Sequence, residues 1–138
     1  MTGSEAVTAV ALYINSRKAD VFGQCGGAVF KFKKIDGYDG DYIAVNCLPF
    51  YYKDSMNTDV LNVNVHVKVM PSGEPNLKRL EAIKNAVIGM FEIEDGVELN
   101  GAFFEKRTSS DTPVLDEDNT YYVNIKLDCH HSNVKYKR

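Results

Sequence analysis

Residues 59–92 constrain the fold more than any other part of this chain, because a strand pattern there passes directly into a helix pattern. Apolar side chains alternate with polar ones from Leu61 to Val69, as in a strand with one buried and one solvent-facing side. These patterns predict a long strand over Asp59–Met70 and a helix that is capped by Asn76 and stopped by Glu94–Gly96. The expected inward stripe of the helix is Leu77, Leu80, Ile83, Val87, Met90 and Phe91.

The predicted strand has about 12 residues, whereas strands usually have 5–6. A strand of this length can extend beyond the rest of its sheet. The extension would present backbone amide and carbonyl groups to a neighbouring subunit, which is a route to assembly by strand addition.

The flanking segments complete an α+β fold. We expect a helix over Glu5–Ser16, a loop over Val21–Gly27, a hairpin of strands Ala28–Lys34 and Tyr42–Leu48, a strand over Val97–Lys106 with a bulge or a close backbone approach at Gly101, a polar loop over Thr108–Asn119 and a last strand over Thr120–Cys129. The predicted architecture is a single antiparallel or mixed β-sheet, with an N-terminal helix and a second helix packed on it. We expect one domain over residues 1–138, with a core over 5–130 and a basic C-terminal tail over 131–138.

Composition limits the classes of function. The 138 residues are 44% hydrophobic and 25% charged, which is typical of a globular domain, and the net charge of −3 gives no global attraction to nucleic acid. No apolar run approaches the ~20 residues of a membrane span, and the N-terminus lacks the basic region of a secretory signal. Three cysteines at wide spacings favour a reducing compartment over a disulfide framework. We therefore expect no membrane association and formation in a cytoplasm.

The histidines and cysteines do not form a known catalytic or metal-binding motif. Cys129, His130 and His131 resemble a metal-ligand cluster most closely, but adjacent strand residues point in opposite directions and no CxxC pair accompanies them. His66 lies on the polar side of the long strand, and we expect it to be a solvated strand residue. No catalytic residue, metal or cofactor is expected.

Two further segments have a chemical and a structural interpretation. Gly23–Gly27 is glycine-rich but lacks the Lys-Ser/Thr pair of a phosphate-binding loop and precedes a strand, so we interpret it as a flexible joint. The acidic residues Asp116, Glu117 and Asp118 could bind a hard cation, but the remaining oxygen ligands of a calcium loop are missing. We expect a solvated turn whose charge steers a basic partner or repels DNA.

Two groups of residues are candidates for contacts with partners. The projecting loop 50–57 begins with Phe50, Tyr51, Tyr52 and Lys53, which could anchor a partner or pack over the edge of their own sheet. The basic residues of the tail are Lys135, Lys137 and Arg138. They could lie on a phosphate backbone or an acidic partner, and a solvated, frayed end is the alternative.

The chain resembles the tail-completion or tail-terminator proteins of long-tailed bacteriophages. The resemblance lies in VLNVNVHVKVMPSGEPNLKRLEAIKNAV, with DYIAVNCLPF before it and DTPVLDEDNTYYVNIKLDC after it, and it covers most of residues 5–130. The order of elements also agrees: an N-terminal helix, a hairpin, a long strand running into a helix, then closing strands. The cysteines and the basic tail have no match in the family.

The resemblance implies a structural virion protein that assembles in the host cytoplasm. Such proteins form a homo-oligomeric ring, commonly hexameric, on the end of the tail tube and provide the joint to the neck or head connector. The partners implied are further copies of the chain, the tail tube and the connector proteins. DNA would pass through the lumen without sequence-specific binding, and acidic loops would let it slide. No catalytic residue carries over.

Two alternatives remain open. One is another neck or head-completion ring protein of the same virion. The other belongs to a different class: a cytoplasmic enzyme or small-ligand-binding module that uses a pocket near His66 and Cys47.

Overall fold

The computed structural model describes residues 1–51, 56–92 and 95–132, and these form an α+β fold with one curled, mixed sheet, as the sequence predicts. The helical elements are α1 (Gly3–Ser16), α2 (Lys18–Phe22), a 3₁₀ turn η1 (Gly23–Cys25) and α3 (Leu77–Glu92). The strands are β1 (Ala28–Lys31), β2 (Tyr42–Cys47), β3 (Met56–Lys68), β4 (Val97–Leu99), β5 (Ala102–Ser109), β6 (Val114–Leu115) and β7 (Thr120–Ser132).

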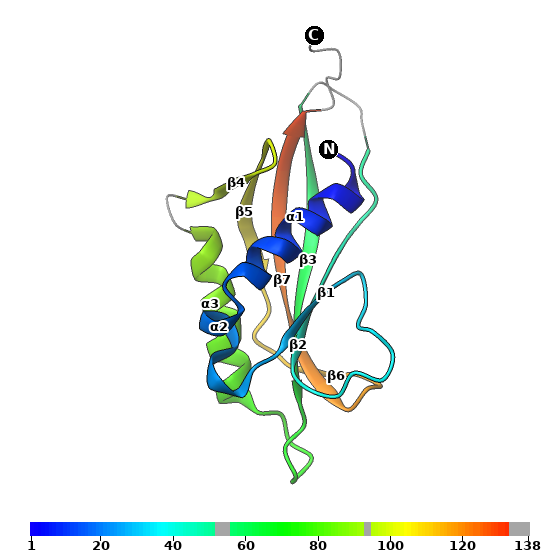
Figure 1. Cartoon of the computed structure of the whole chain (residues 1–138), viewed down its shortest axis with the longest axis vertical. Coiled ribbons are helices and arrows are strands. Elements are labelled where there is room, and N and C mark those ends of the chain that lie inside the picture. Colours follow the sequence, from blue (N-terminus) through cyan, green and yellow to red (C-terminus); the bar gives the residue numbers. More distant parts are fainter. Residues whose placement is uncertain (52–55, 93–94, 133–138) are drawn as a thin grey trace.

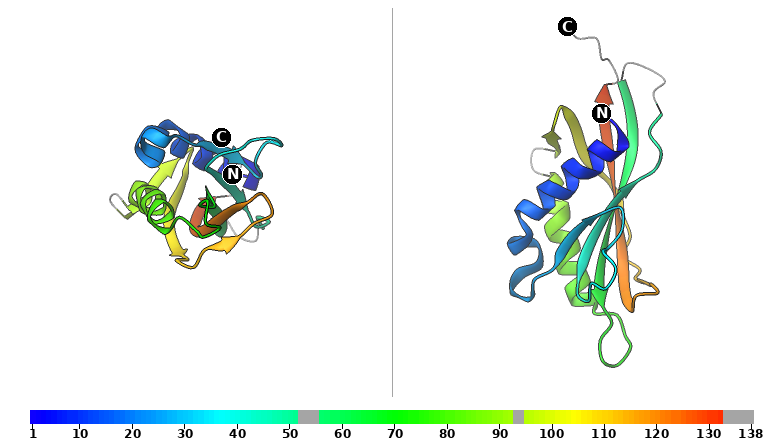
Figure 2. Two further views of the ribbon diagram at one scale, coloured as in Figure 1. Left: turned by 90° about the horizontal axis from the view of Figure 1, so that it is seen from below. Right: turned by 45° about the vertical axis from the view of Figure 1, so that its right-hand side comes forward.

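The sheet has the order β1-β2-β3-β7-β5-β4, and β6 pairs with β7 outside this path. Both long helices lie on one side of it: α1 crosses β1 and β2, while α3 packs on β3, β5 and β7 (Figure 1). Figure 2 shows the sheet curving around these helices. The core lies between the two layers, and Ile14, Ile43, Leu61, Ile83 and Phe104 are among its fully buried side chains.

The helix ends follow from local sequence. Thr2 and Glu5 form the expected capping box, in which each side chain accepts a hydrogen bond from the backbone N–H of the other. Asn76 caps α3, since its side chain accepts a hydrogen bond from the N–H of Arg79 at 3.1 Å. The predicted apolar stripe of α3 is buried from Leu80 to Phe91, but Leu77 in the first turn is 58% exposed.

The expected hairpin of β1 and β2 is wrong, because the two strands pair in parallel, with Ala28 opposite Tyr42 and Lys31 opposite Val45. Phe32 has a positive φ of 67° and turns the chain out of the strand immediately after β1. The connecting residues 32–41 then return to the starting end of β1 before β2 begins. The turn dipeptides Asp36-Gly37 and Asp39-Gly40 lie within this return loop instead of forming a tight hairpin.

Gly101 is not a bulge in one strand, as predicted, but part of a two-residue hairpin turn. Asn100 and Gly101 have φ values of 51° and 86°, and Leu99 pairs with Ala102 across them. Positive φ at both central residues is the geometry of a type I′ turn, for which Asn-Gly is a preferred sequence. The segment therefore makes two strands, β4 and β5.

Other boundaries also differ from the prediction. The loop expected over Thr108–Asn119 contains the end of β5 and the short strand β6. The last strand continues to Ser132, three residues beyond the expected Cys129, because its whole length pairs with β3. The expected loop Val21–Gly27 begins within α2, where Phe22 is buried.

β3 and β7 form the long axis of the molecule (Figure 1). Their ladder runs from Met56 opposite Ser132 to Lys68 opposite Thr120, whereas β2 pairs only with residues 61–66 of β3. Residues 56–60 of β3 thus extend beyond β2 but stay paired with β7, so the strand does not extend beyond its whole sheet, as the sequence analysis suggested it could. We call residues 56–60 of β3 and 128–132 of β7 the ribbon end.

Candidate functional site

The sheet face opposite the helices carries a continuous hydrogen-bonded group of polar side chains in its middle. Alternation places Asn62 and Asn64 of β3 on this face, opposite Asn46 of β2 and beside Asn124 and Lys126 of β7. Asn62 donates to Asn46 at 3.0 Å, Asn124 donates to Asn64 at 2.9 Å, and the Lys126 ammonium donates to Asn62 at 2.7 Å. The middle of this face is thus polar and carries one cation among neutral amides.

Below the amide group, an aromatic cluster surrounds His66. The His66 ring stacks on Tyr42, with centroids 4.2 Å apart, and on Tyr122 at 4.9 Å, so it lies between two aromatic rings on neighbouring strands. Phe30 and Tyr38 extend the cluster through edge contacts with Tyr42. His66 is only 5% exposed, so the expectation of a solvated histidine is wrong. The aromatic neighbours on β2 and β7 cover it.

Two carboxylates of the β6–β7 turn lie against this cluster. His66 Nδ1 is 2.9 Å from Thr120 Oγ1, and the Thr120 hydroxyl donates to Asp118 Oδ1 at 2.5 Å. The other oxygen of Asp118 accepts from the Tyr42 hydroxyl at 2.5 Å. Asp116 Oδ2 lies 3.8 Å from His66 Nδ1. We call His66, Asp116, Asp118 and Thr120 the His66 cluster.

Local backbone geometry brings the turn to this position. The N–H of Asp116 donates to the carbonyl of Thr120, and Asn119 between them has a positive φ of 64°. Asn tolerates this conformation better than most residues, so the acidic turn folds back at the start of β7. Lys34, from the loop after β1, lies 3.8 Å from Asp118.

The electrostatics of the cluster favour a neutral His66 beside an ionised Asp118. Burial lowers the pKa of His66, and this effect outweighs the opposing influence of Asp118 and Asp116. Burial raises the pKa of Asp118, but hydrogen bonds from Thr120 and Tyr42 together lower it by more, so the net shift is downward. Burial, together with the hydrogen bond to Asp118, raises the pKa of the Tyr42 hydroxyl.

A second histidine cluster lies at the ribbon end, on the same face of the sheet. His130 Nδ1 is 2.9 Å from Thr58 Oγ1 and its Nε2 is 2.6 Å from Glu105 Oε2, so both ring nitrogens have partners. Asp128 lies nearby and forms an ion pair with Arg107 at 3.4 Å.

Exposed apolar side chains surround this second cluster. Leu48, Met56 and Phe103 are 52%, 62% and 38% exposed. The register places Met56 beside Ser132 and Phe103 beside His130, and the N–H of Leu48 donates to the carbonyl of Val60. We call Leu48, Met56, Val60, Phe103 and His130 the ribbon patch.

His131 lies on the other side of the sheet, as expected for a strand neighbour of His130. It is 1% exposed, its Nε2 is 2.7 Å from Asp59 Oδ2, and its ring stacks on Phe50. Cys129 is fully buried on this same side. The three residues Cys129, His130 and His131 therefore do not converge on one site.

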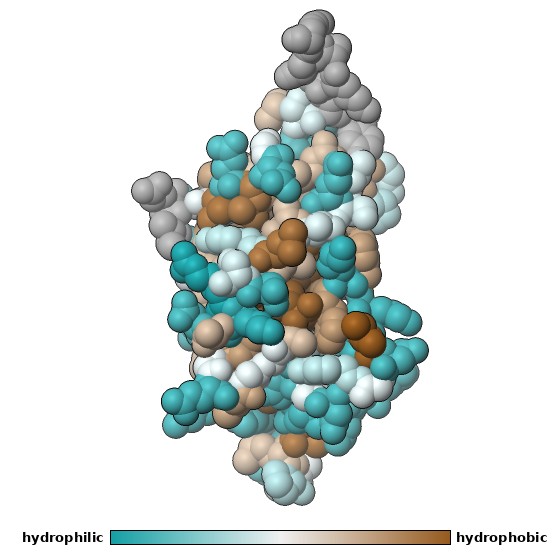
Figure 3. All heavy atoms as spheres, viewed as in Figure 1, coloured by the Kyte–Doolittle hydropathy of each residue, from teal (hydrophilic) through white to brown (hydrophobic). Residues whose placement is uncertain are grey.

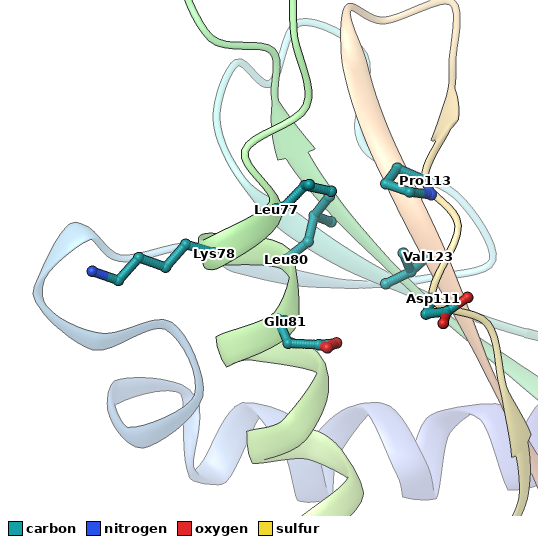
Figure 4. Close-up of a pocket in the computed structure, with 7 residues that line it drawn as sticks. All are labelled: Leu77, Lys78, Leu80, Glu81, Asp111, Pro113 and Val123. Atoms are coloured by element: carbon teal, nitrogen blue, oxygen red, sulfur yellow. The ribbon is translucent and has the colours of Figure 1, made fainter.

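An open apolar groove of about 330 Å³ lies where α3 begins. Leu77 and Leu80 face Pro113 and Val123 across it (Figure 4). Its charged neighbours are Lys78, Glu81 and Asp111. The lining residues include no serine, cysteine or histidine, so the groove offers an apolar surface but no nucleophile.

The candidate interaction residues fall into different environments. Phe50 is half-buried against His131, in agreement with the alternative that it packs on its own sheet, whereas Tyr51 is 62% exposed. Asp116 and Asp118 belong to the His66 cluster, and Glu117 between them is exposed. Tyr52, Lys53, Lys135, Lys137 and Arg138 lie outside the described residues.

Two interpretations from sequence need correction. His66 and Cys47 cannot line one pocket, because Cys47 pairs with Leu61 on the helix side of the sheet and His66 lies on the opposite side. We interpreted Gly23–Gly27 as a flexible joint. The segment is instead bound to α3, because the Arg79 guanidinium donates hydrogen bonds to the carbonyl oxygens of Phe22 and Gly26.

The sequence analysis missed Tyr42, Tyr122 and Thr120 as parts of a site. The sequence did contain a signal for this site, because three predicted strands carry aromatic side chains at one end of their polar side. Such residues are out of place on a fully solvated face.

Comparisons with known proteins leave the family open. No protein-family model matches the chain, and a search of curated proteins finds no match. None of the helices in the described part of the chain has the length and apolar character of a membrane-spanning segment.

Proposed function

We propose that this chain is a non-enzymatic structural subunit of a tailed-bacteriophage virion. In this proposal it forms a homo-oligomeric ring, commonly hexameric in the family it resembles, that completes the tail and joins it to the neck. The support is the resemblance in residues 5–130, together with an α+β fold that has the element order the resemblance implies, apart from the parallel pairing of β1 with β2.

The observation that carries the proposal is the ribbon patch. At the ribbon end the sheet narrows to β3, β7 and β5, because β2 pairs only with residues 61–66 of β3. Leu48, Met56 and Phe103 are exposed there, around the paired polar groups of His130 and Glu105. An apolar surface with polar groups that are already satisfied is suited to burial against another copy of the chain.

The helix side is less suited to such a contact. Its outer surface carries many hydrophilic residues, with hydrophobic patches scattered between them (Figure 3). Leu12 of α1 is 63% exposed, but single exposed apolar residues are common on monomeric proteins. We therefore assign the contact between copies to the ribbon patch.

The charge pattern also agrees with passage of DNA through a ring. The middle of the open sheet face presents amides and Lys126, and its lower end carries the acidic turn 116–118. A surface of this kind binds a phosphate backbone weakly, because it releases few counterions.

The first experiment measures assembly of the purified chain by light scattering and negative-stain microscopy. We expect annular particles for the wild-type protein. Phe103→Ser combined with Leu48→Asp should give folded monomers, whereas Leu12→Ser, a change at an exposed apolar residue of α1, should leave the rings intact. Rings that persist in the double variant would remove the ribbon patch from the interface.

The second experiment tests the place of the ring in a particle. Purified rings are mixed with tail tubes, and we expect density at one end of the tube. A protein that stays monomeric even in the presence of tube and connector would overturn the proposal. Binding to the connector alone would instead favour a neck or head-completion ring.

The groove at the start of α3 supports the alternative of a different class. An apolar volume of about 330 Å³ is at the small end of the range for ligand pockets. A small-ligand module would show a ligand-dependent rise in melting temperature that Leu80→Asn or Val123→Asn abolishes. It would also remain monomeric at concentrations at which a ring protein assembles.

A further inference from the structure

We propose that the His66 cluster is a binding site for a divalent transition-metal ion, held by His66, Asp116 and Asp118. The inference does not depend on the proposed function, because it concerns the ion and the fold of one chain. One imidazole nitrogen with two carboxylates is a donor set that Zn²⁺ accepts, and Mn²⁺ is the nearest competitor.

The positions of the donor atoms support the site. One nitrogen of His66 and one oxygen from each carboxylate all lie within 4.8 Å of one another. A point therefore exists within ~2.8 Å of all three atoms, and Zn–N and Zn–O bonds are about 2.0–2.2 Å. Side-chain shifts of less than ~1 Å would bring the donors to bonding distance.

Each donor is already oriented by a second group. Asp116 Oδ1 accepts from the N–H of Glu117 at 2.7 Å, which turns Oδ2 toward His66. The Tyr42 hydroxyl holds Oδ2 of Asp118. The rings of Tyr42 and Tyr122 fix the plane of His66 from both sides. Such outer contacts are what a metal site needs to keep its ligands in place.

Charge and protonation also suit a cation. The two carboxylates contribute −2, and Lys34 at 3.8 Å from Asp118 returns +1, so the site is net negative. A metal binds the neutral form of an imidazole, because only that form has a free lone pair.

Thr120 indicates what changes when the ion binds. Its hydroxyl donates to Asp118, so the neutral His66 donates from Nδ1–H to Thr120 Oγ1 in the metal-free protein. Ligation by Nδ1 requires the other neutral tautomer, with the proton on Nε2. The imidazole remains uncharged throughout, and the Thr120 oxygen becomes available as a fourth, neutral donor.

The cluster at the ribbon end is a weaker candidate although its residue types are the same. Both ring nitrogens of His130 already have partners, and Asp128 is paired with Arg107. An ion there would have to displace the guanidinium of Arg107 from Asp128 and break one hydrogen bond of His130.

The test uses the full chain after removal of metals with EDTA, with Zn²⁺ alone as the probe. Calorimetry should show one ion per chain, and Zn²⁺ at a hundredfold excess over Kd should raise Tm by at least about 4 °C. Asp116→Asn and Asp118→Asn should each weaken binding at least ~10-fold. Asp116 is partly exposed, so its variant remains informative if Asp118→Asn fails to fold.

The matched control is Glu117→Gln, which removes the same charge from an exposed residue of the same turn. It should bind Zn²⁺ like the wild type, as should Cys25→Ser and His130→Gln. The absence of measurable binding at about 100 μM Zn²⁺ would overturn the proposal. So would equal weakening by Glu117→Gln and Asp116→Asn, or loss of binding in His130→Gln alone.

Discussion

His66 and Tyr42 stack face to face across the β2–β3 ladder, with ring centroids 4.2 Å apart and ring planes 9° apart. Tyr122 covers the other side of the imidazole from β7. The three residues come from three adjacent strands, so the stack links β2, β3 and β7. It also forces an ionisable ring into a largely water-free position.

The stack predicts a loss of stability in mild acid. Burial lowers the pKa of folded His66 below its usual 6.5, with Asp118 and Asp116 opposing the shift and Lys34 adding to it. The unfolded chain therefore takes up a proton at a higher pH than the folded chain does. The stability that depends on a neutral His66 is fully present above about pH 6.5. It falls as the pH drops through the pKa of the folded state, by at most ~1.4 kcal/mol per pH unit.

The measurement is urea unfolding of the metal-free protein at pH 7.5 and 5.5. Carboxylates also titrate toward the lower pH, so the wild type is compared with His66→Gln. The variant should lose less stability between the two pH values, even though it is less stable at pH 7.5. An identical pH dependence in the two proteins would exclude His66 as the titrating group.

Arg79 should stabilise the fold by joining three segments. Its Nε lies 3.0 Å from Asp41 Oδ2, and its other nitrogens donate to the carbonyl oxygens of Phe22 and Gly26. Arg79→Ala removes a half-buried, charged donor, and these acceptors lose their hydrogen bonds to it. The change should therefore lower the free energy of unfolding by about 2 kcal/mol. Lys78→Ala, at the neighbouring exposed position of α3, should change it by less than ~0.5 kcal/mol in the same denaturation experiment.

Two Gly→Ala changes, one in the turn between β4 and β5 and one in α3, should have opposite effects on stability. Gly101 has a φ of +86°, so Gly101→Ala should cost about 1–2 kcal/mol through backbone strain. Gly89 lies within α3 with no atom near its added Cβ, so Gly89→Ala should add about 0.5–1 kcal/mol. Thermal unfolding of both variants checks the signs, and a neutral Gly101→Ala would contradict the type I′ turn.

The parts of the fold that depend on local spacing could be predicted from the sequence. Alternation over Leu61–Val69 and the apolar stripe of α3 identify buried faces directly, and Thr2 and Asn76 mark helix starts by short-range hydrogen bonds. The Asn100-Gly101 pair also carried a local signal for a hairpin, so this miss lay in the interpretation and not in the sequence.

The rest depended on contacts between distant residues. Asp-Gly pairs are compatible with a hairpin or with a wider return loop, and only the partner of β1 decides between them. The hydrogen bond from Tyr42 to Asp118 joins residues 76 positions apart. An acidic turn and a strand histidine were both visible as patterns, but their meeting at Thr120 follows from the register of β3 on β7.

The three cysteines should differ sharply in reactivity, because a thiol must ionise and be reachable to react. Cys25 is exposed, whereas burial and the nearby Asp59 raise the pKa of the half-buried Cys47, and burial raises that of Cys129 to about 12. At pH 8 a thiol reagent should modify one cysteine of the native protein rapidly and all three in denaturant. Cys25→Ser should remove the rapid phase alone. If Cys129 reacted as fast as Cys25 in native protein, the last strand could not be packed beneath the helices as the β3–β7 ladder requires.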